Sequence, residues 1–184
     1  MITTALPVLL LLLAAAVAPQ ADVRSGRTGP PPGGPRVSVP DLTPPATLSV
    51  TGAVSAPLVL APADLKAMPR TTVDAGENGR TVRYEGVLVG ELLRRAGAAV
   101  GPALRGDAVA SYVVAHAVDG YRAVFALAEL DNAFVQNDVL VADTVDGRPL
   151  FDYQGPWRLV APRDLRGARS VRMLDRLEVV RLTR

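Results

Sequence analysis

The chain has 184 residues, a formal net charge of +2 and no cysteine. Without cysteine it contains no thiolate nucleophile, cysteine-ligated zinc site or iron–sulfur cluster. One Trp, four Tyr and three Phe give little capacity for base stacking, so we expect no nucleic-acid partner. The charge is unevenly placed, because residues 158–184 hold eight arginines and only three acidic residues.

An apolar run, LPVLLLLLAAAVA, occupies residues 6–18. It is short for a membrane span and ends in small residues, which is typical of a secretory signal. We therefore expect residues 1–20 to be a signal peptide and the remaining chain to be extracytoplasmic, that is periplasmic, secreted or membrane-tethered. An uncleaved N-terminal anchor is the alternative, and it is the one case in which we expect contact with a membrane.

Residues 21–46 are rich in Pro and Gly and show no apolar periodicity, which predicts a disordered linker. Residues 47–184 remain, enough for one domain with a single core. Strands are expected in this domain at 47–54, 58–60, 80–85, 110–118, 121–126, 139–143, 157–161 and 177–182. Short helices are expected at 63–68 and 89–96.

Two Asp-Gly pairs predict tight turns, at residues 119–120 and 146–147. The first should join two strands into an antiparallel hairpin. The segment DAGENG, residues 74–79, also has a composition typical of a turn. Many short strands with a few short helices predict an α+β fold, with the strands in one mixed or antiparallel sheet curled around its own core.

Few side chains offer catalytic chemistry. His116 is the only histidine, which excludes a multi-histidine metal site within this chain. A structural role in its strand is the simpler interpretation of His116, and a role as ligand or general base is the alternative. The aspartates follow turn positions, and no phosphate-binding glycine loop is present.

Arginines recur in the segment WRLVAPRDLRGARSVRMLDR, residues 157–176. They are Arg163, Arg166, Arg169, Arg172 and Arg176. Gly167 and Val171 disfavour a continuous helix, so we expect a loop with single turns. Guanidinium groups that converge in a loop form an anion site, because each planar fork bonds phosphate oxygens in pairs. Separate solvation of each arginine is the alternative.

Four longer stretches follow one another in a specific order: YEGVLVGELLRRAGA (84–98), DGYRAVFALAEL (119–130), VLVADTVDGRPL (139–150) and GPWRLVAPRDLRGARSVRMLDRLEV (155–179). They contain an aromatic-x-Gly-Val strand end, an Asp-Gly-Tyr turn, an Asp-Gly-x-Pro-Leu turn and a Gly-Pro-x-Arg-Leu-Val-x-Pro stretch before a basic loop. In this order they resemble the oxidoreductase molybdopterin-binding domain, the sulfite-oxidase-like fold. The resemblance implies mixed, mostly antiparallel sheets with a few short helices.

In that family the basic loop helps to hold the pterin cofactor. The resemblance therefore implies that Arg169, Ser170 and Arg172 bind molybdopterin or another small anionic ligand. By the same comparison Arg163 or Arg166 could assist from the entrance of the loop. His116 is kept as a further candidate for cofactor binding.

Catalytic members of the family carry a cysteine ahead of the aromatic-x-Gly-Val segment, and its thiolate ligates molybdenum. The corresponding stretch here, TTVDAGENGRTVRYEGV at residues 71–87, has none, so no thiolate-ligated molybdenum is expected. Three interpretations remain. The domain binds a pterin or other anion without such a metal, or it is an atypical oxidoreductase whose metal is ligated by His116 or an acidic residue. Alternatively it has lost the site and is an interaction module for an envelope protein partner.

Overall fold

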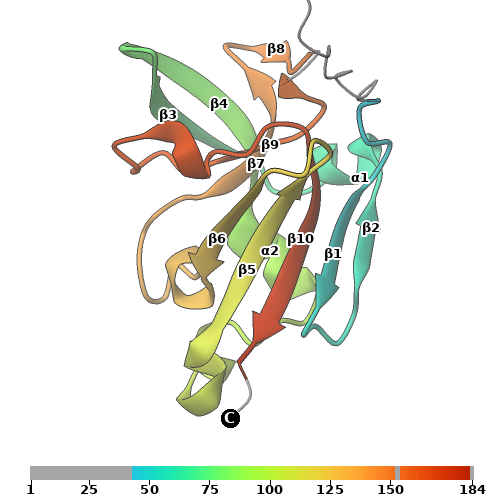
Figure 1. Cartoon of the computed structure of the whole chain (residues 1–184), viewed down its shortest axis with the longest axis vertical. Helices are drawn as coiled ribbons and strands as arrows, with labels where there is room; N and C mark the ends of the chain where they lie inside the picture. The colour runs from blue at the N-terminus through green and yellow to red at the C-terminus, as the bar shows by residue number, and fades with distance from the viewer. Residues whose placement is uncertain (1–42, 152–153, 183–184) are drawn as a thin grey trace, which may run out of the picture. The chain divides into compact units, whose positions relative to one another are not determined.

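The computed structural model describes residues 43–151 and 154–182, which belong to one compact unit. The predicted signal peptide at residues 1–20 and most of the predicted linker at 21–46 lie outside the described residues. The described part folds into two five-stranded β-sheets with a few short helices (Figure 1).

The first sheet is mixed and joins segments that are distant in the sequence. Its strands in spatial order are β2 (Leu58–Leu60), β1 (Leu48–Gly52), β10 (Leu174–Arg181), β5 (Ser111–Ala117) and β6 (Arg122–Ala126). The β1–β10 pair is parallel, and the other neighbouring pairs are antiparallel. The centre of the sheet is therefore β10, the last strand of the described chain.

The second sheet is antiparallel throughout. Its strands are β3 (Thr71–Glu77), β4 (Arg80–Leu88), β7 (Leu140–Val145), β8 (Arg148–Pro149) and β9 (Arg158–Val160). The β4–β7 register shifts between Glu85 and Gly86. A Cβ atom on Gly86 would lie 2.0 Å from the carbonyl oxygen of Val141, so only glycine allows the two backbones to approach this closely.

The helices are short. The α-helices are α1 (Pro62–Lys66) and α2 (Val89–Arg95), and the 3₁₀ turns include η1 (Gly101–Ala103), η2 (Gly106–Ala110), η3 (Leu127–Leu130) and η5 (Gly167–Arg169). Within residues 43–151 and 154–182, no helix has the length and apolarity that a membrane crossing needs.

The main core lies between the first sheet, α2 and one face of the second sheet. Leu92 and Leu93 of α2 are fully buried, as is Leu177 of β10. Figure 1 shows α2 behind β5 and β10. The opposite face of the second sheet carries a smaller apolar cluster around Tyr84 and Leu140. Because side chains alternate along a strand, residues on this second face, Arg158 among them, point away from the main core.

Most predicted elements are confirmed, with ends that differ by a few residues. The 119–120 hairpin forms between β5 and β6, the 146–147 turn joins β7 to β8, and α2 ends before Gly97 as expected. The expectation of a single sheet is wrong, because the strands divide between two sheets that share the core.

The turn expected at residues 74–79 is also wrong over most of its length. Residues Thr71–Glu77 form β3, and the turn is confined to Asn78 and Gly79, which have φ values of 51° and 76°. Two successive positive φ angles favour Asn-Gly and match the twist of a hairpin. The polar residues of β3 are tolerated because it is an edge strand that is exposed at alternate positions.

Candidate functional site

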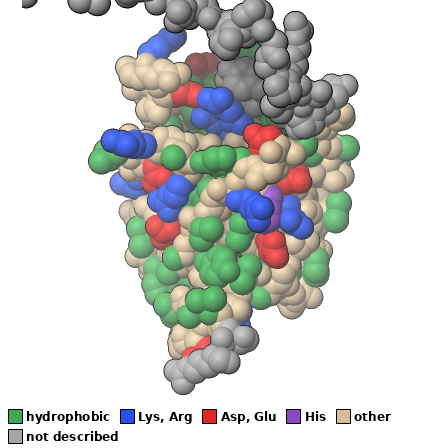
Figure 2. Space-filling view, in the orientation of Figure 1, with side chains coloured by type: hydrophobic (Ala, Val, Ile, Leu, Met, Phe, Trp, Pro, Cys, Tyr) green, Lys and Arg blue, Asp and Glu red, His purple; other side chains and the backbone are tan. Residues whose placement is uncertain are grey.

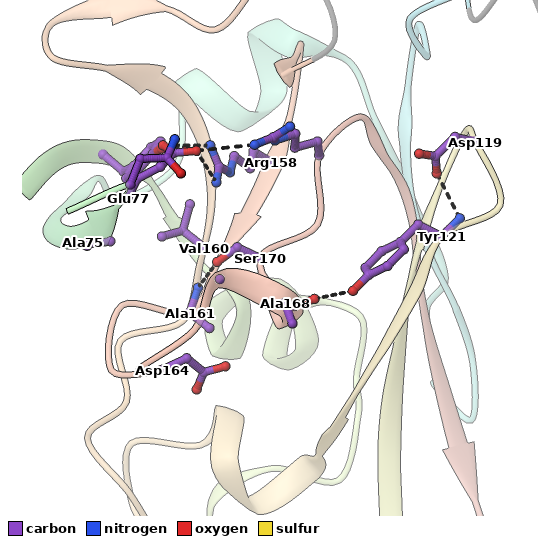
Figure 3. A pocket seen from close by; sticks show the side chains of 15 residues that line it. Ala75, Glu77, Asp119, Tyr121, Arg158, Val160, Ala161, Asp164, Ala168 and Ser170 are labelled. Atoms are coloured by element: carbon purple, nitrogen blue, oxygen red, sulfur yellow. Dashed lines mark hydrogen bonds and ion pairs between the residues drawn. The ribbon is translucent and has the colours of Figure 1, made fainter. Parts of the chain in front are cut away.

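A pocket of about 410 Å³ opens where three segments meet. These are the β3–β4 hairpin, the turn between β5 and β6, and the arginine-containing loop at residues 161–172 (Figure 3). Its polar side chains are Glu77, Asn78, Tyr84, Asp119, Tyr121, Arg158, Asp164, Ser170 and Arg172. The hydroxyl of Tyr121 donates to the carbonyl of Ala168, which fastens the loop to the first sheet.

The deepest charged group of the pocket is Arg158, whose side chain is only 7% exposed. Its two terminal nitrogens lie 3.1 and 3.3 Å from the carboxylate oxygens of Glu77. One of them also donates to the Tyr84 hydroxyl at 2.8 Å and to the Gln154 side-chain oxygen at 3.1 Å. The Arg158 guanidinium lies 5.1 Å from the centre of the Tyr84 ring. These contacts provide partners for most of the hydrogen-bond donors of Arg158 and compensate a charge that would otherwise be costly to bury.

Glu77 and Tyr84 share a short hydrogen bond, in which the phenol donates to the carboxylate at 2.5 Å. Burial raises the pKa of Glu77, but hydrogen bonds from Tyr84 and Arg158 and the nearby positive charges outweigh it, so the pKa lies below its ordinary value of 4.5. Burial and the bond to Glu77 raise the pKa of Tyr84 to about 12. At neutral pH the pocket wall therefore contains an ionised carboxylate and a protonated phenol.

Two of the residues predicted from the sequence line this pocket. Arg172 is 46% exposed in its side chain and contacts Glu77 at 3.4 Å. The hydroxyl of Ser170 accepts a hydrogen bond from the backbone N–H of Ala161 at 3.2 Å, which closes the loop on itself.

A family model for the oxidoreductase molybdopterin binding domain matches residues 36–183. The chain belongs to this family. The predicted α+β fold with mixed, mostly antiparallel sheets and a sulfite-oxidase-like architecture is thereby confirmed. The family binds molybdopterin, and this member of it has no cysteine.

Among solved structures, the chain is similar to the sulfane dehydrogenase SoxCD from Paracoccus pantotrophus, with a TM-score of 0.57 and 24% sequence identity. The match covers 72% of this chain and 37% of the SoxCD chain, so the likeness concerns the fold of one part of a longer protein. The comparison with curated proteins finds no match.

Arg169 does not line the pocket of this molybdopterin-binding domain. Its guanidinium forms two hydrogen bonds with Asp164, at 2.8 and 2.7 Å, and reaches Glu129 at 3.2 Å. It also lies over the Phe125 ring, 4.6 Å from the ring centre. The hydrogen bonds to Asp164 raise the pKa of Arg169 further above its ordinary value. In this conformation Arg169 holds the loop against η3 and β6.

The remaining predicted residues also lie outside the pocket lining. Arg163 and Arg166 are exposed on the loop. His116 is on β5, where its Nε2 lies 3.0 Å from Glu178 and its Nδ1 accepts from Arg176 at 3.2 Å. Arginine can only donate, so Nδ1 is the unprotonated nitrogen in this arrangement.

The residues that dominate the pocket wall, Glu77, Tyr84 and Arg158, were not predicted as site residues from the sequence. Arg158 is the arginine of the Gly-Pro-x-Arg stretch, and Tyr84 is the aromatic residue of the aromatic-x-Gly-Val segment. Glu77 was read as part of a turn. The lining contains two arginines and three carboxylates. The arginines of the loop therefore do not give the side chains of the lining a net positive charge.

The available donors do not fit thiolate-ligated molybdenum. The β3–β4 hairpin, the segment in which the resemblance places the family's cysteine, offers the carboxylates of Asp74, Glu77 and Glu85. All three are engaged by arginines, which are Arg83, Arg158 and Arg70 respectively. Among the described residues there is also no group of three or more His, Cys, Asp or Glu side chains arranged to hold a metal.

Proposed function

We propose that this domain binds a small anionic ligand, such as the phosphate end of a pterin, in the pocket beside Arg172. We further propose that it does so outside the cytoplasm and without thiolate-ligated molybdenum. Family membership supports the ligand class, the cysteine-free sequence supports the absence of a metal–thiolate bond, and the apolar run at residues 6–18 supports export. An oxidoreductase activity of the usual kind is not part of this proposal.

The observation that carries the proposal is the position of Arg172. Its half-exposed guanidinium lies at the pocket wall, in the loop that resembles the family's pterin-binding loop. A planar guanidinium can bond two oxygens of one phosphate. Ser170 lies beside it in the lining, and a hydroxyl that accepts one hydrogen bond can still donate another to a ligand.

Cofactor content tests the pterin part of the proposal. The full chain is exported from a host that makes molybdopterin, purified, and analysed for molybdenum by mass spectrometry and for pterin by its fluorescence after oxidation. We expect pterin without stoichiometric molybdenum. Stoichiometric molybdenum would reject the proposed absence of a metal, and a protein free of pterin would reject the pterin as the ligand.

A direct binding measurement tests the role of Arg172 in holding the anion. Dimethyl phosphate is titrated into the full chain by calorimetry, and Arg172→Gln is compared with Arg166→Gln, which removes the same charge from an exposed position outside the lining. We expect Arg172→Gln to weaken binding by about tenfold, because a charge-assisted bidentate contact is lost. An equal loss in both variants would mean that dimethyl phosphate follows the charge of the loop and does not occupy the pocket.

A second candidate function is an interaction module for an envelope protein. The outer face of the first sheet favours it, because Val124 and Val59 are exposed there at 52% and 68%. Figure 2 shows hydrophobic side chains gathered on this face below the charged groups around His116. Affinity purification of the tethered protein from envelope extracts tests this function. It fails if no protein is enriched over Val124→Asp, which places a charge on the same face.

A further inference from the structure

Glu77 contacts both arginines that line the pocket, Arg158 and Arg172. Arg158 contacts both of its carboxylate oxygens, at 3.1 and 3.3 Å. Arg172 contacts one of the same oxygens, Oε1, at 3.4 Å. The carboxylate thus stands where a ligand anion between two guanidinium groups would stand, and it belongs to the chain itself.

The two arginines hold Glu77 unequally. Arg158 is buried, makes two contacts to the carboxylate and is also bonded to Tyr84 and Gln154. Arg172 is 46% exposed, and its contact to the Glu77 carboxylate is longer, at 3.4 Å. The Arg172 contact is exposed to solvent and longer than the usual range of about 2.7–3.2 Å for an N–H···O hydrogen bond, so it is the one that an incoming anion can replace.

The position of Glu77 is also fixed by its backbone. It is the last residue of β3, pairs with Arg80 across the hairpin, and precedes the Asn78-Gly79 turn. The Tyr84 hydroxyl donates to its other oxygen, Oε2. A carboxylate held at both oxygens and at the end of a paired strand cannot swing away when a ligand enters. Its negative charge therefore acts on whatever binds beside Arg172.

We propose that Glu77 is a specificity-determining residue, whose carboxylate competes with the ligand for Arg172 and makes the pocket select groups with one negative charge over groups with two. This inference rests on the proposed anion site and deepens it. The charges of the lining agree with it, since its three carboxylates outnumber its two arginines. Applied to the proposed pterin, this favours a phosphate that is a diester, or another monoanion, over a terminal phosphate monoester.

Two probes of matched shape separate these classes. Dimethyl phosphate carries one negative charge at pH 7, whereas methyl phosphate carries nearly two, because the second pKa of a phosphate monoester is about 6. Each is titrated into the full chain, and binding is followed by NMR chemical shifts of the loop amides. In Glu77→Gln we expect the affinity for methyl phosphate to rise about tenfold and that for dimethyl phosphate by a smaller factor, because a nearby carboxylate repels the second charge more.

Asp74→Asn is the matched control, since Asp74 lies on the same strand, is 50% exposed and is outside the pocket lining. It removes one negative charge three residues along the strand, about 10 Å from Glu77, which is as long as the distance over which physiological salt screens charges. Glu77 also neutralises the buried Arg158, so folding of Glu77→Gln is checked by circular dichroism. Glu77→Asp is measured beside it, because this variant keeps the negative charge but shortens the side chain. We expect its affinities for the two probes to lie between those of the native chain and those of Glu77→Gln.

The outcomes distinguish the two proposals. A shift of the monoester-to-diester affinity ratio in Glu77→Gln and Glu77→Asp, absent in Asp74→Asn, supports the role of Glu77. An unchanged ratio, or the same shift in Asp74→Asn, overturns that role while leaving the anion site standing. If neither probe binds the native chain or any variant, the anion site itself is rejected, and the role of Glu77 with it.

Discussion

Arg158 and Glu77, which are 81 positions apart in the sequence, form a two-contact ion pair in the wall of the pocket. Their side chains are 7% and 20% exposed. The pair connects β9 to the end of the β3–β4 hairpin, so the hairpin is fixed to the rest of the second sheet by a charged contact as well as by strand pairing. Removing one partner of such a pair leaves an uncompensated charge in a poorly solvated place.

We therefore predict that Arg158→Met lowers the free energy of unfolding by about 3 kcal/mol, because the Glu77 carboxylate and the Tyr84 hydroxyl lose their buried donor. Urea unfolding can be followed by the fluorescence of Trp157, the single tryptophan, which is 1% exposed. Arg83→Met is the control, since Arg83 pairs with Asp74 in the same hairpin but is 67% exposed. It should leave stability nearly unchanged, and equal losses in both variants would contradict the importance of burial.

The free energy of unfolding at acidic pH should depend on the ionisation of Glu77. Its pKa is lower in the folded chain than the ordinary value of 4.5. The unfolded chain then binds the proton more readily, so the stabilisation from the ionised carboxylate is complete above pH 4.5 and is lost as the pH falls through the lower, folded value. The difference in unfolding free energy between the native chain and Glu77→Gln should shrink over this window. A difference that stays constant from neutral to acidic pH would show that the charge of Glu77 contributes nothing.

Gly86 provides a test of the second sheet that does not involve charge. A side chain there would meet the Val141 carbonyl oxygen at 2.0 Å and the Ala142 Cα at 2.6 Å, both of which are backbone atoms. We predict that Gly86→Ala costs about 3 kcal/mol of stability, since the strands must separate to admit the methyl group. Gly76→Ala, in the neighbouring strand, meets nothing within 4 Å. It should be neutral or stabilising by up to about 1 kcal/mol in the same unfolding experiment.

Local signals were sufficient for much of the fold. Asp119-Gly120 predicted the β5–β6 hairpin because the turn needs backbone angles that Gly adopts readily. The strand β3 was missed because Asp74 and Gly76 are turn-forming residues in isolation and precede Asn78-Gly79. Asp74 and Gly76 lie in an edge strand here because β4 supplies partners for all seven residues of β3. Pairing of this kind depends on a second segment and is not visible in the composition of the first.

The candidate site was predictable only as a region. The sequence placed positive charge at residues 163–172, but the partner of each arginine is decided by the tertiary fold. Arg169 contacts Glu129, which is 40 positions away in the sequence, and Arg172 contacts Glu77, which is 95 positions away. Glu77 itself gave no signal, since an acidic residue beside Asn-Gly is ordinary for a turn. Spacing along the loop therefore could not separate an arginine that lines the pocket from one that supports the loop.

Arg169 is predicted to support the loop and not to bind a ligand. Its contacts with Asp164, Glu129 and the Phe125 ring suit a structural role, so Arg169→Ala should loosen the loop. The cost to global stability should be about 1 kcal/mol, because solvent screens the ion pairs of a side chain that is 37% exposed. The local effect should be larger than the global one, since a loop can open without unfolding of the sheets.

Amide hydrogen exchange measures this local opening. The N–H of Ser170 is bonded to the Gly167 carbonyl, and the N–H of Ala161 to the Ser170 hydroxyl, so both bonds close the loop that Arg169 supports. Both amides should exchange faster in Arg169→Ala, while Arg163→Ala, an exposed substitution in the same loop, should leave them unchanged. Unchanged protection in Arg169→Ala would mean that the loop keeps its shape without this arginine. The guanidinium of Arg169 would then be available to a ligand once its carboxylate partners are displaced.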